Sequence, residues 1–233
     1  MLLLLVLLTS AKQTELPKEY NYGKSASGTK ITLTFQRGVA HNHPLFAVWL
    51  ADDKGRYLET LYVSESIAKG VFPKANRKNG FWESGEIQRP AALPYWAHQR
   101  NMQNEYGTYN PTPRKPLLDG VTGATPTASF VLNLRSKKVL SGSYTLYFEV
   151  NQSWDWNEYW FNNRFPGDKE YATSSQPALV YSVDLLVPSK GKTWVMKPVG
   201  HSHPSGADGS LTTNLSTLTS ALKIAESLSV TLP

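Results

Sequence analysis

Short segments of alternating apolar and polar residues, separated by turn residues, are the feature that most constrains the fold of this chain. In residues 29–36, Ile31, Leu33 and Phe35 share one face, and residues 142–151 alternate in the same way. A period of two residues is typical of a strand that is buried on one side. Further segments of this kind, or continuous apolar runs of strand length, lie at 45–50, 57–64, 127–135, 178–187, 192–199 and 227–232. The pattern predicts a mainly β protein.

About eight strands with Gly/Pro turns and little helix favour an immunoglobulin-like antiparallel β-sandwich. Residues 29–36, 45–50 and 57–64 are expected to form an antiparallel meander, with a hairpin turn at 53–55 (DKG). Residues 127–135 and 142–151 are expected to form a second pair. A short C-terminal helix is expected to begin at Thr213 or Asn214, before the last strand.

The predicted domain organisation is simple. Residues 1–11 form an export signal, residues 12–28 a polar tether, and residues 29–233 a single β-sandwich domain. Residues 66–118 have no sustained period and are interpreted as a long irregular insertion, in which a helix over 91–101 is interrupted by Pro94. An insertion of this length in a compact domain usually has a function.

The composition narrows the class of protein. The chain has no cysteine, which excludes disulfides, thiolate metal sites and a cysteine nucleophile. Its 24 basic residues against 18 acidic residues are scattered, so nucleic-acid binding is not expected. The apolar block 1–8 is too short to span a bilayer and is followed by small residues, as in a secretory signal. The chain is therefore expected to be periplasmic or otherwise exported, and peripheral at most to a membrane. The alternative is a cytosolic protein with an apolar start.

Residues 119–126 (DGVTGATP) separate the insertion from the second half of the expected sandwich. Gly123 and Ala124 leave the backbone accessible, and Pro126 favours an extended conformation at Thr125. The segment therefore presents a hydroxyl with small neighbours. The alternative is a glycine-containing entry into a strand, with Asp119 bonded to nearby backbone amides.

Several segments together resemble a known family. They are 46–55 (FAVWLADDKG), 58–63 (LETLYV), 89–96 (RPAALPYW), 119–126, 148–160 (FEVNQSWDWNEYW), 208–211 (DGSL) and 215–221 (LSTLTSA). The chain is similar to a bacterial family of predicted periplasmic proteins of unknown function, members of which occur near PepSY-type membrane flavoreductases. The similarity covers nearly all of the chain after the expected export signal.

The string 119–125 is also similar to the FMN-acceptor motif of flavoprotein subunits in sodium- and ferredoxin-linked respiratory oxidoreductases. In that motif a flavin transferase esterifies FMN to the final Thr. The resemblance implies covalent FMN on Thr125, with Asp119, Thr122, Gly123 and Ala124 as the recognition motif. It also implies a flavin transferase and a membrane flavoreductase as partners, and extracytoplasmic electron transfer as the function. Aromatic walls for the flavin are expected from the insertion: Phe81, Trp82, Tyr95 and Trp96.

Four histidines form two matched pairs, each followed by proline: His41 and His43, and His201 and His203. Residues two apart on an extended backbone point the same way, so each pair is a possible two-nitrogen clamp. Two such clamps side by side would suit Cu or Zn. The alternative is solvated histidines in turns.

Residues 154–160 are dense in aromatic, acidic and amide side chains. Trp154, Asp155, Trp156, Asn157, Glu158 and Trp160 are candidates for a partner or ligand surface. Asp155 and Glu158 form a conceivable acid pair, but sequence proximity does not set the separation that glycoside hydrolysis needs. An electron carrier, or a cofactor-free binding or scaffold protein, is therefore expected rather than a hydrolase.

Overall fold

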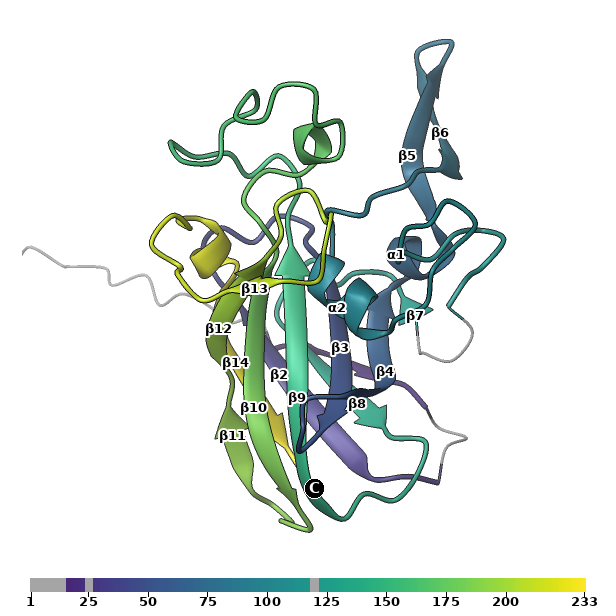
Figure 1. Cartoon of the computed structure of the whole chain (residues 1–233). Coiled ribbons are helices and arrows are strands. Elements are labelled where there is room, and N and C mark those ends of the chain that lie inside the picture. Colours follow the sequence, from purple (N-terminus) through teal and green to yellow (C-terminus); the bar gives the residue numbers. More distant parts are fainter. Residues whose placement is uncertain (1–15, 24–26, 118–121) are drawn as a thin grey trace, which may run out of the picture.

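The computed structural model describes residues 16–23, 27–117 and 122–233, and shows a sandwich of two sheets with a projecting hairpin (Figure 1). The strands are β1 (Lys18–Asn21), β2 (Lys30–Arg37), β3 (Leu45–Asp52), β4 (Tyr57–Ser64), β5 (Val71–Lys78), β6 (Phe81–Glu86), β7 (Thr122–Gly123), β8 (Phe130–Arg135), β9 (Gly142–Asn151), β10 (Leu179–Val187), β11 (Thr193–Val195), β12 (Lys197–Ser202), β13 (Leu211–Thr212) and β14 (Ala225–Thr231). The helices are α1 (Glu65–Lys69) and α2 (Pro94–Gln99), with short 3₁₀ turns at Tyr171–Thr173 and Ala221–Lys223.

Within the described residues, one sheet has the strand order β1-β8-β2-β14-β11 and the other β13-β12-β10-β9-β3-β4-β7. The alternating side chains of β2 and β9 meet between the sheets, where Phe35 and Phe148 have ring centroids 6.0 Å apart. Ile31, Leu33 and Leu146 are fully buried in the same core. Burying each such side chain contributes about 1.5–3 kcal/mol. The predicted mainly β sandwich is confirmed.

Two of the predicted strand pairings are wrong. β2 lies in the five-stranded sheet, whereas β3 and β4 lie in the seven-stranded sheet, so the first three strands do not form one meander. Likewise β8 pairs with β2, while β9 pairs with β3 and β10. The chain crosses between the layers at these connections instead of turning back beside itself. The predicted hairpin at 53–55 is confirmed, because β3 and β4 are antiparallel neighbours there.

The insertion packs on the outer face of the seven-stranded sheet, where α1 and α2 lie over β3 and β4 (Figure 1). Trp49 of β3 and Val180 of β10 point outward and are covered by Leu93 and Trp96, all at most 2% exposed. Where this second core covers it, the seven-stranded sheet is apolar on both faces. The sandwich therefore carries two cores, one between the sheets and one under the insertion.

The prediction that the insertion is irregular is wrong for two of its segments. Residues 71–86 contain the β5–β6 hairpin, in which only Phe72 is buried, so the pattern of a strand with one buried face is missing. Pro94 begins α2 instead of interrupting a helix, because proline is well suited to the first helical turn, where its missing N–H costs nothing.

The ends of the chain also differ from expectation. The predicted polar tether contains β1, which pairs with β8 in parallel register. The expected C-terminal helix is reduced to the 3₁₀ turn Ala221–Lys223, and the last strand, β14, pairs with β2. The predicted export signal at 1–11 lies outside the described residues. None of the described helices has both the length and the apolar character needed to cross a bilayer.

Candidate functional site

The segment 122–126 lies at the edge of the seven-stranded sheet. β7 adds to β4 in parallel register, with Val63 opposite Thr122 and Ser64 opposite Gly123. The hydroxyl of Tyr62 donates hydrogen bonds to the carbonyl oxygens of Gly123, at 3.0 Å, and Ala124, at 3.3 Å. The backbone of the motif is therefore fixed to β4. Asp119, the first residue of the motif, lies outside the described residues.

Packing at this edge favours glycine at position 123. A Cβ atom added there would overlap the hydroxyl of Tyr22 and come within 3.2 Å of the Tyr62 hydroxyl. The rings of Tyr22 and Tyr62 lie 5.2 Å apart between centroids. The strand-entry interpretation is thus sufficient to explain this glycine, and a cofactor is not needed to explain it.

Gly123→Ala is expected to lower the free energy of unfolding by about 1–3 kcal/mol, because the new methyl group overpacks against the two tyrosines. Urea unfolding of the variant gives the value. Truncating Tyr22 to Ala removes the obstructing ring, so the double variant Tyr22→Ala/Gly123→Ala should lose less than the sum of the single losses. Strictly additive losses would contradict the packing explanation.

The hydroxyl of Thr125 is half-buried and donates a hydrogen bond of 2.9 Å to Ser64 Oγ. Ser64 is fully buried and also accepts the backbone N–H of Phe46 at 3.0 Å. Thr125 and the exposed Ala124 border an open pocket of about 400 Å³. Its other lining residues are Glu65, Ser66, Val71, Pro73 and Ser84. The acceptor hydroxyl named by the motif therefore lies at the wall of a pocket between the edge of the sheet and the base of the β5–β6 hairpin.

The aromatic side chains expected to wall a flavin are divided between two places. Trp96 is fully buried in the second core, so its assignment to a flavin wall is wrong. Tyr95 is half-buried and packs with Trp49, at 5.9 Å between ring centroids. Phe81 and Trp82 are exposed on β6, the strand that contributes Ser84 to the pocket. Alternation along β6 places Trp82 on the same face of the hairpin as Ser84.

The two histidine pairs have different surroundings. His41 is half-buried against Phe35, and His43 is exposed. His201 is buried and donates through Nδ1 to the carbonyl of Ser202 at 2.9 Å, while His203 Nδ1 accepts the amide of Ser205 at 3.3 Å. Burial lowers the pKa of both His41 and His201. Across residues 16–23, 27–117 and 122–233, His, Cys, Asp and Glu side chains nowhere gather in threes to hold a metal. The Cu or Zn site stays a prediction.

The segment 154–160 is attached to the loop 214–220. Asn157 donates to the carbonyl of Thr217 at 2.9 Å, and the Trp160 indole donates to the Thr217 hydroxyl at 3.1 Å. Asp155 accepts the hydroxyl of Ser220, and burial raises its pKa, opposed by hydrogen bonds from Ser220 and Gln176. Of the six predicted surface residues, these three therefore have a structural role.

The remaining members of the predicted surface differ in exposure. Trp156 is half-buried and packs against the core, whereas Glu158 is exposed and Trp154 is 66% exposed. Three further exposed aromatic side chains lie nearby in sequence: Tyr159, Phe161 and Phe165. The exposed aromatic surface is thus larger than predicted along the loop 152–176 and excludes Trp160. Asp155 is half-buried and bonded to Ser220, whereas Glu158 is exposed.

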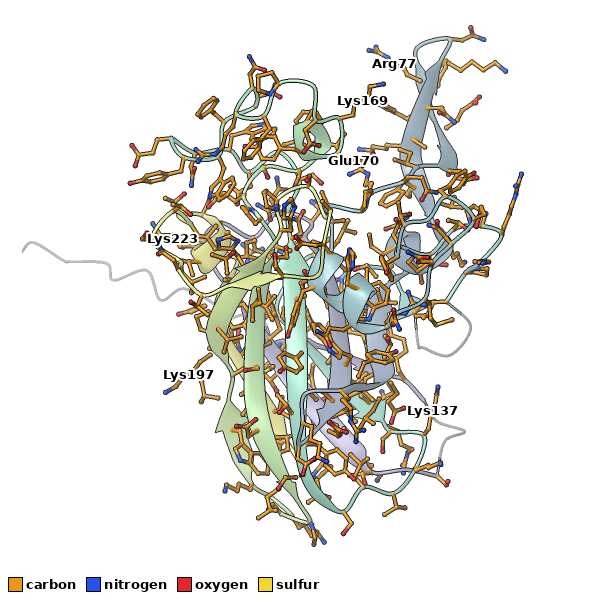
Figure 2. All side chains as sticks on the ribbon, viewed as in Figure 1. Arg77, Lys137, Lys169, Glu170, Lys197 and Lys223 are labelled. Atoms are coloured by element: carbon orange, nitrogen blue, oxygen red, sulfur yellow. The ribbon has the colours of Figure 1, made fainter. Side chains whose placement is uncertain are left out.

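A second pocket, of about 360 Å³, has no local sequence signal, because separate segments build it. The His98 ring lies 4.1 Å from the Tyr109 ring and donates through Nε2 to the carbonyl of Gly206 at 3.3 Å. Asp168 and Glu170 enter from the loop 152–176, where Figure 2 labels Glu170. Burial, together with the charge of Asp168, raises the pKa of Glu170.

Comparison with known proteins found no relative of this chain. No family model, no curated protein and no solved structure matches the chain.

Proposed function

We propose that this chain is an exported carrier of FMN, esterified to Thr125, that takes part in electron transfer outside the cytoplasm. The observation that carries the proposal is the position of Thr125. The last hydroxyl of an FMN-acceptor-like motif lies at the wall of an open pocket of about 400 Å³. Small-molecule sites typically have volumes of about 300–1,000 Å³, so the pocket has a suitable size.

The residues around the pocket fit a tethered flavin in two respects. Ala124 is exposed and adds no bulk beside the hydroxyl, and Tyr62 holds the backbone that presents it. Val71 and Pro73 give the pocket an apolar side. Bound FMN would supply reversible one- and two-electron chemistry.

Attachment changes the hydrogen bonding of two residues. In the structure, the Thr125 hydroxyl hydrogen is directed to Ser64 Oγ. Esterification replaces this hydrogen with the phosphoryl group, so Ser64 Oγ no longer accepts a hydrogen bond from Thr125. Ser64 is therefore a positioning residue: it holds the Thr125 side chain against β4 before attachment, and transfer requires this bond to break.

The proposal is tested by co-expressing the chain with a flavin transferase and measuring the intact and peptide masses. Wild type and Thr125→Ser are expected to carry one FMN-phosphoryl adduct, whereas Thr125→Ala is expected to carry none. Thr127→Ala is the matched control, because Thr127 is an exposed threonine two residues away. It should keep the adduct. Absence of an adduct on wild type, or an adduct that persists in Thr125→Ala, would contradict the proposal.

A second candidate function is binding without a cofactor through the loop 152–176. The observation that favours it is the exposure of Trp154, Tyr159, Phe161 and Phe165, since several exposed aromatic side chains on one loop are typical of a contact surface. Protein purified from its native host separates the two functions. A colourless preparation without visible flavin absorbance favours binding, and a yellow one favours the flavin carrier.

A further inference from the structure

The β5–β6 hairpin projects away from the sandwich (Figure 1). Its base is anchored by Phe72, which is buried and lies under the guanidinium of Arg89 at 4.6 Å. Beyond Phe72 most of the hairpin is exposed. Asn79 and Gly80 both have positive φ, at 51° and 84°, as the tight turn of a two-residue hairpin loop requires. The sequence thus forms a well-defined projection that contributes little to either core.

The tip combines two exposed aromatic side chains with two cations. Phe81 is 76% exposed and Trp82 is 56% exposed. Lys78 is paired with Phe81 across the hairpin, and Arg77 with Trp82. Neither cation forms a salt bridge within the described residues. Figure 2 shows Arg77 near the outer end of the hairpin. Each face of the tip therefore carries one ring and one positive charge.

We propose that this tip inserts into the interface of an anionic lipid bilayer. Tryptophan is enriched at the level of the lipid headgroups, where its ring is half in apolar and half in polar surroundings. Arginine and lysine beside it are attracted to anionic headgroups. The acidic residues of the hairpin, Glu83 and Glu86, come after the tip along β6, toward its base. The charge at the outermost part of the hairpin is therefore complementary to an anionic surface.

A protein partner fits the tip less well. A standard protein interface buries about 800 Å² on each side, which is more than a tip of two rings and two cations offers on its own. A bilayer needs only shallow insertion and accepts both faces of the hairpin at once, so it uses Phe81 and Trp82 together. The inference does not depend on FMN. Where both proposals hold, the pocket at Thr125 lies at the hairpin base, on the side of the molecule that meets the membrane.

Co-sedimentation with vesicles tests the inference. Wild type is expected to bind vesicles of phosphatidylglycerol mixed with phosphatidylcholine, to bind pure phosphatidylcholine vesicles weakly, and to lose binding as salt is raised. Phe81→Ser/Trp82→Ser is expected to weaken partitioning by at least about tenfold. The matched control is Val139→Ser/Leu186→Ser, whose side chains are 76% and 57% exposed. It should bind like wild type.

The charge contribution is tested separately. Arg77→Gln/Lys78→Gln is expected to weaken partitioning into the anionic vesicles about 30-fold, since each cation near such a surface contributes about fivefold. Lys190→Gln/Lys197→Gln removes the same charge from exposed positions away from the hairpin and should have a small effect. Unchanged binding of the two tip variants, or equal losses in tip and control variants, would overturn the inference. Failure of wild type to bind anionic vesicles would also overturn it, and would favour a protein as the partner that binds the tip.

Discussion

Trp96→Ala is expected to lower the free energy of unfolding by about 3–5 kcal/mol, the range for truncation of a fully buried tryptophan. Trp96 is 0% exposed in the second core, and its indole N–H donates to the hydroxyl of Thr60 at 2.9 Å. Removing the ring leaves a large cavity between α2 and the seven-stranded sheet. It also takes away a hydrogen bond in a site without water access, so the loss includes both packing and polar contributions.

Trp154→Ala is the matched control for this prediction. The substitution is the same, but Trp154 is 66% exposed on the loop 152–176, so a change within about 0.5 kcal/mol is expected. Urea unfolding followed by far-ultraviolet circular dichroism measures both variants. Similar losses in the two variants would show that the insertion does not depend on Trp96 for its attachment to the sheet.

The strands of this chain were predictable because burial on one side leaves a period-two pattern. β2, β9 and β14 are all recognised in this way, and Ile31, Leu33 and Phe35 are buried as expected. Their neighbours were not predictable from the same pattern. Alternation shows which face of a strand is buried, but it carries no information about which strand lies beside it. The connections after β2 and β8 cross between the sheets, and a turn within one sheet would have produced the same alternation.

The candidate sites also differ in how far they could be predicted, and the reason is again whether the signal is local in the sequence. The segment at 122–125 could be found from sequence because its residues are contiguous. Its packing against Tyr22 and Tyr62 could not be found, since the three parts are far apart in the chain. The pocket between His98 and Glu170 has no local signature for the same reason. The β5–β6 hairpin has no such signal because Phe72 is its only buried residue, and this lack of burial also leaves its exposed rings available to a partner.

Glu149 is the group whose surroundings were least expected from sequence. It lies on the outward face of β9, yet α2 and the insertion cover it completely, and it is 0% exposed. Its two carboxyl oxygens accept the backbone N–H groups of Tyr95, at 3.1 Å, and Trp96, at 2.7 Å. The carboxyl group therefore joins the start of α2 to the sheet. Burial raises its pKa to about 8, although these amides and the Ser202 hydroxyl oppose the shift.

The raised pKa of Glu149 predicts a specific dependence of stability on pH. In the folded protein the group holds its proton up to about pH 8, whereas in the unfolded chain it releases the proton near 4.5, the ordinary pKa of a glutamate side chain. The folded state thus binds more protons across this window, so the stabilisation is complete below pH 4.5 and is lost as pH rises to about 8. The loss is on the order of 4–5 kcal/mol, because each pH unit between the two pKa values corresponds to about 1.36 kcal/mol.

Glu149→Gln removes the titration and should flatten this part of the curve. At about pH 5 the variant is expected to be less stable than wild type by about 1–3 kcal/mol, because an amide nitrogen cannot accept the N–H of Tyr95 or Trp96. The difference should change sign by about pH 9, where wild type has an ionised, buried carboxylate. Urea unfolding from about pH 5 to about pH 9 measures both curves, with the exposed Glu226→Gln as control. Parallel curves for Glu149→Gln and wild type would show that the carboxyl group is already ionised at the acidic end of this range. The two amide hydrogen bonds would then outweigh the cost of burial.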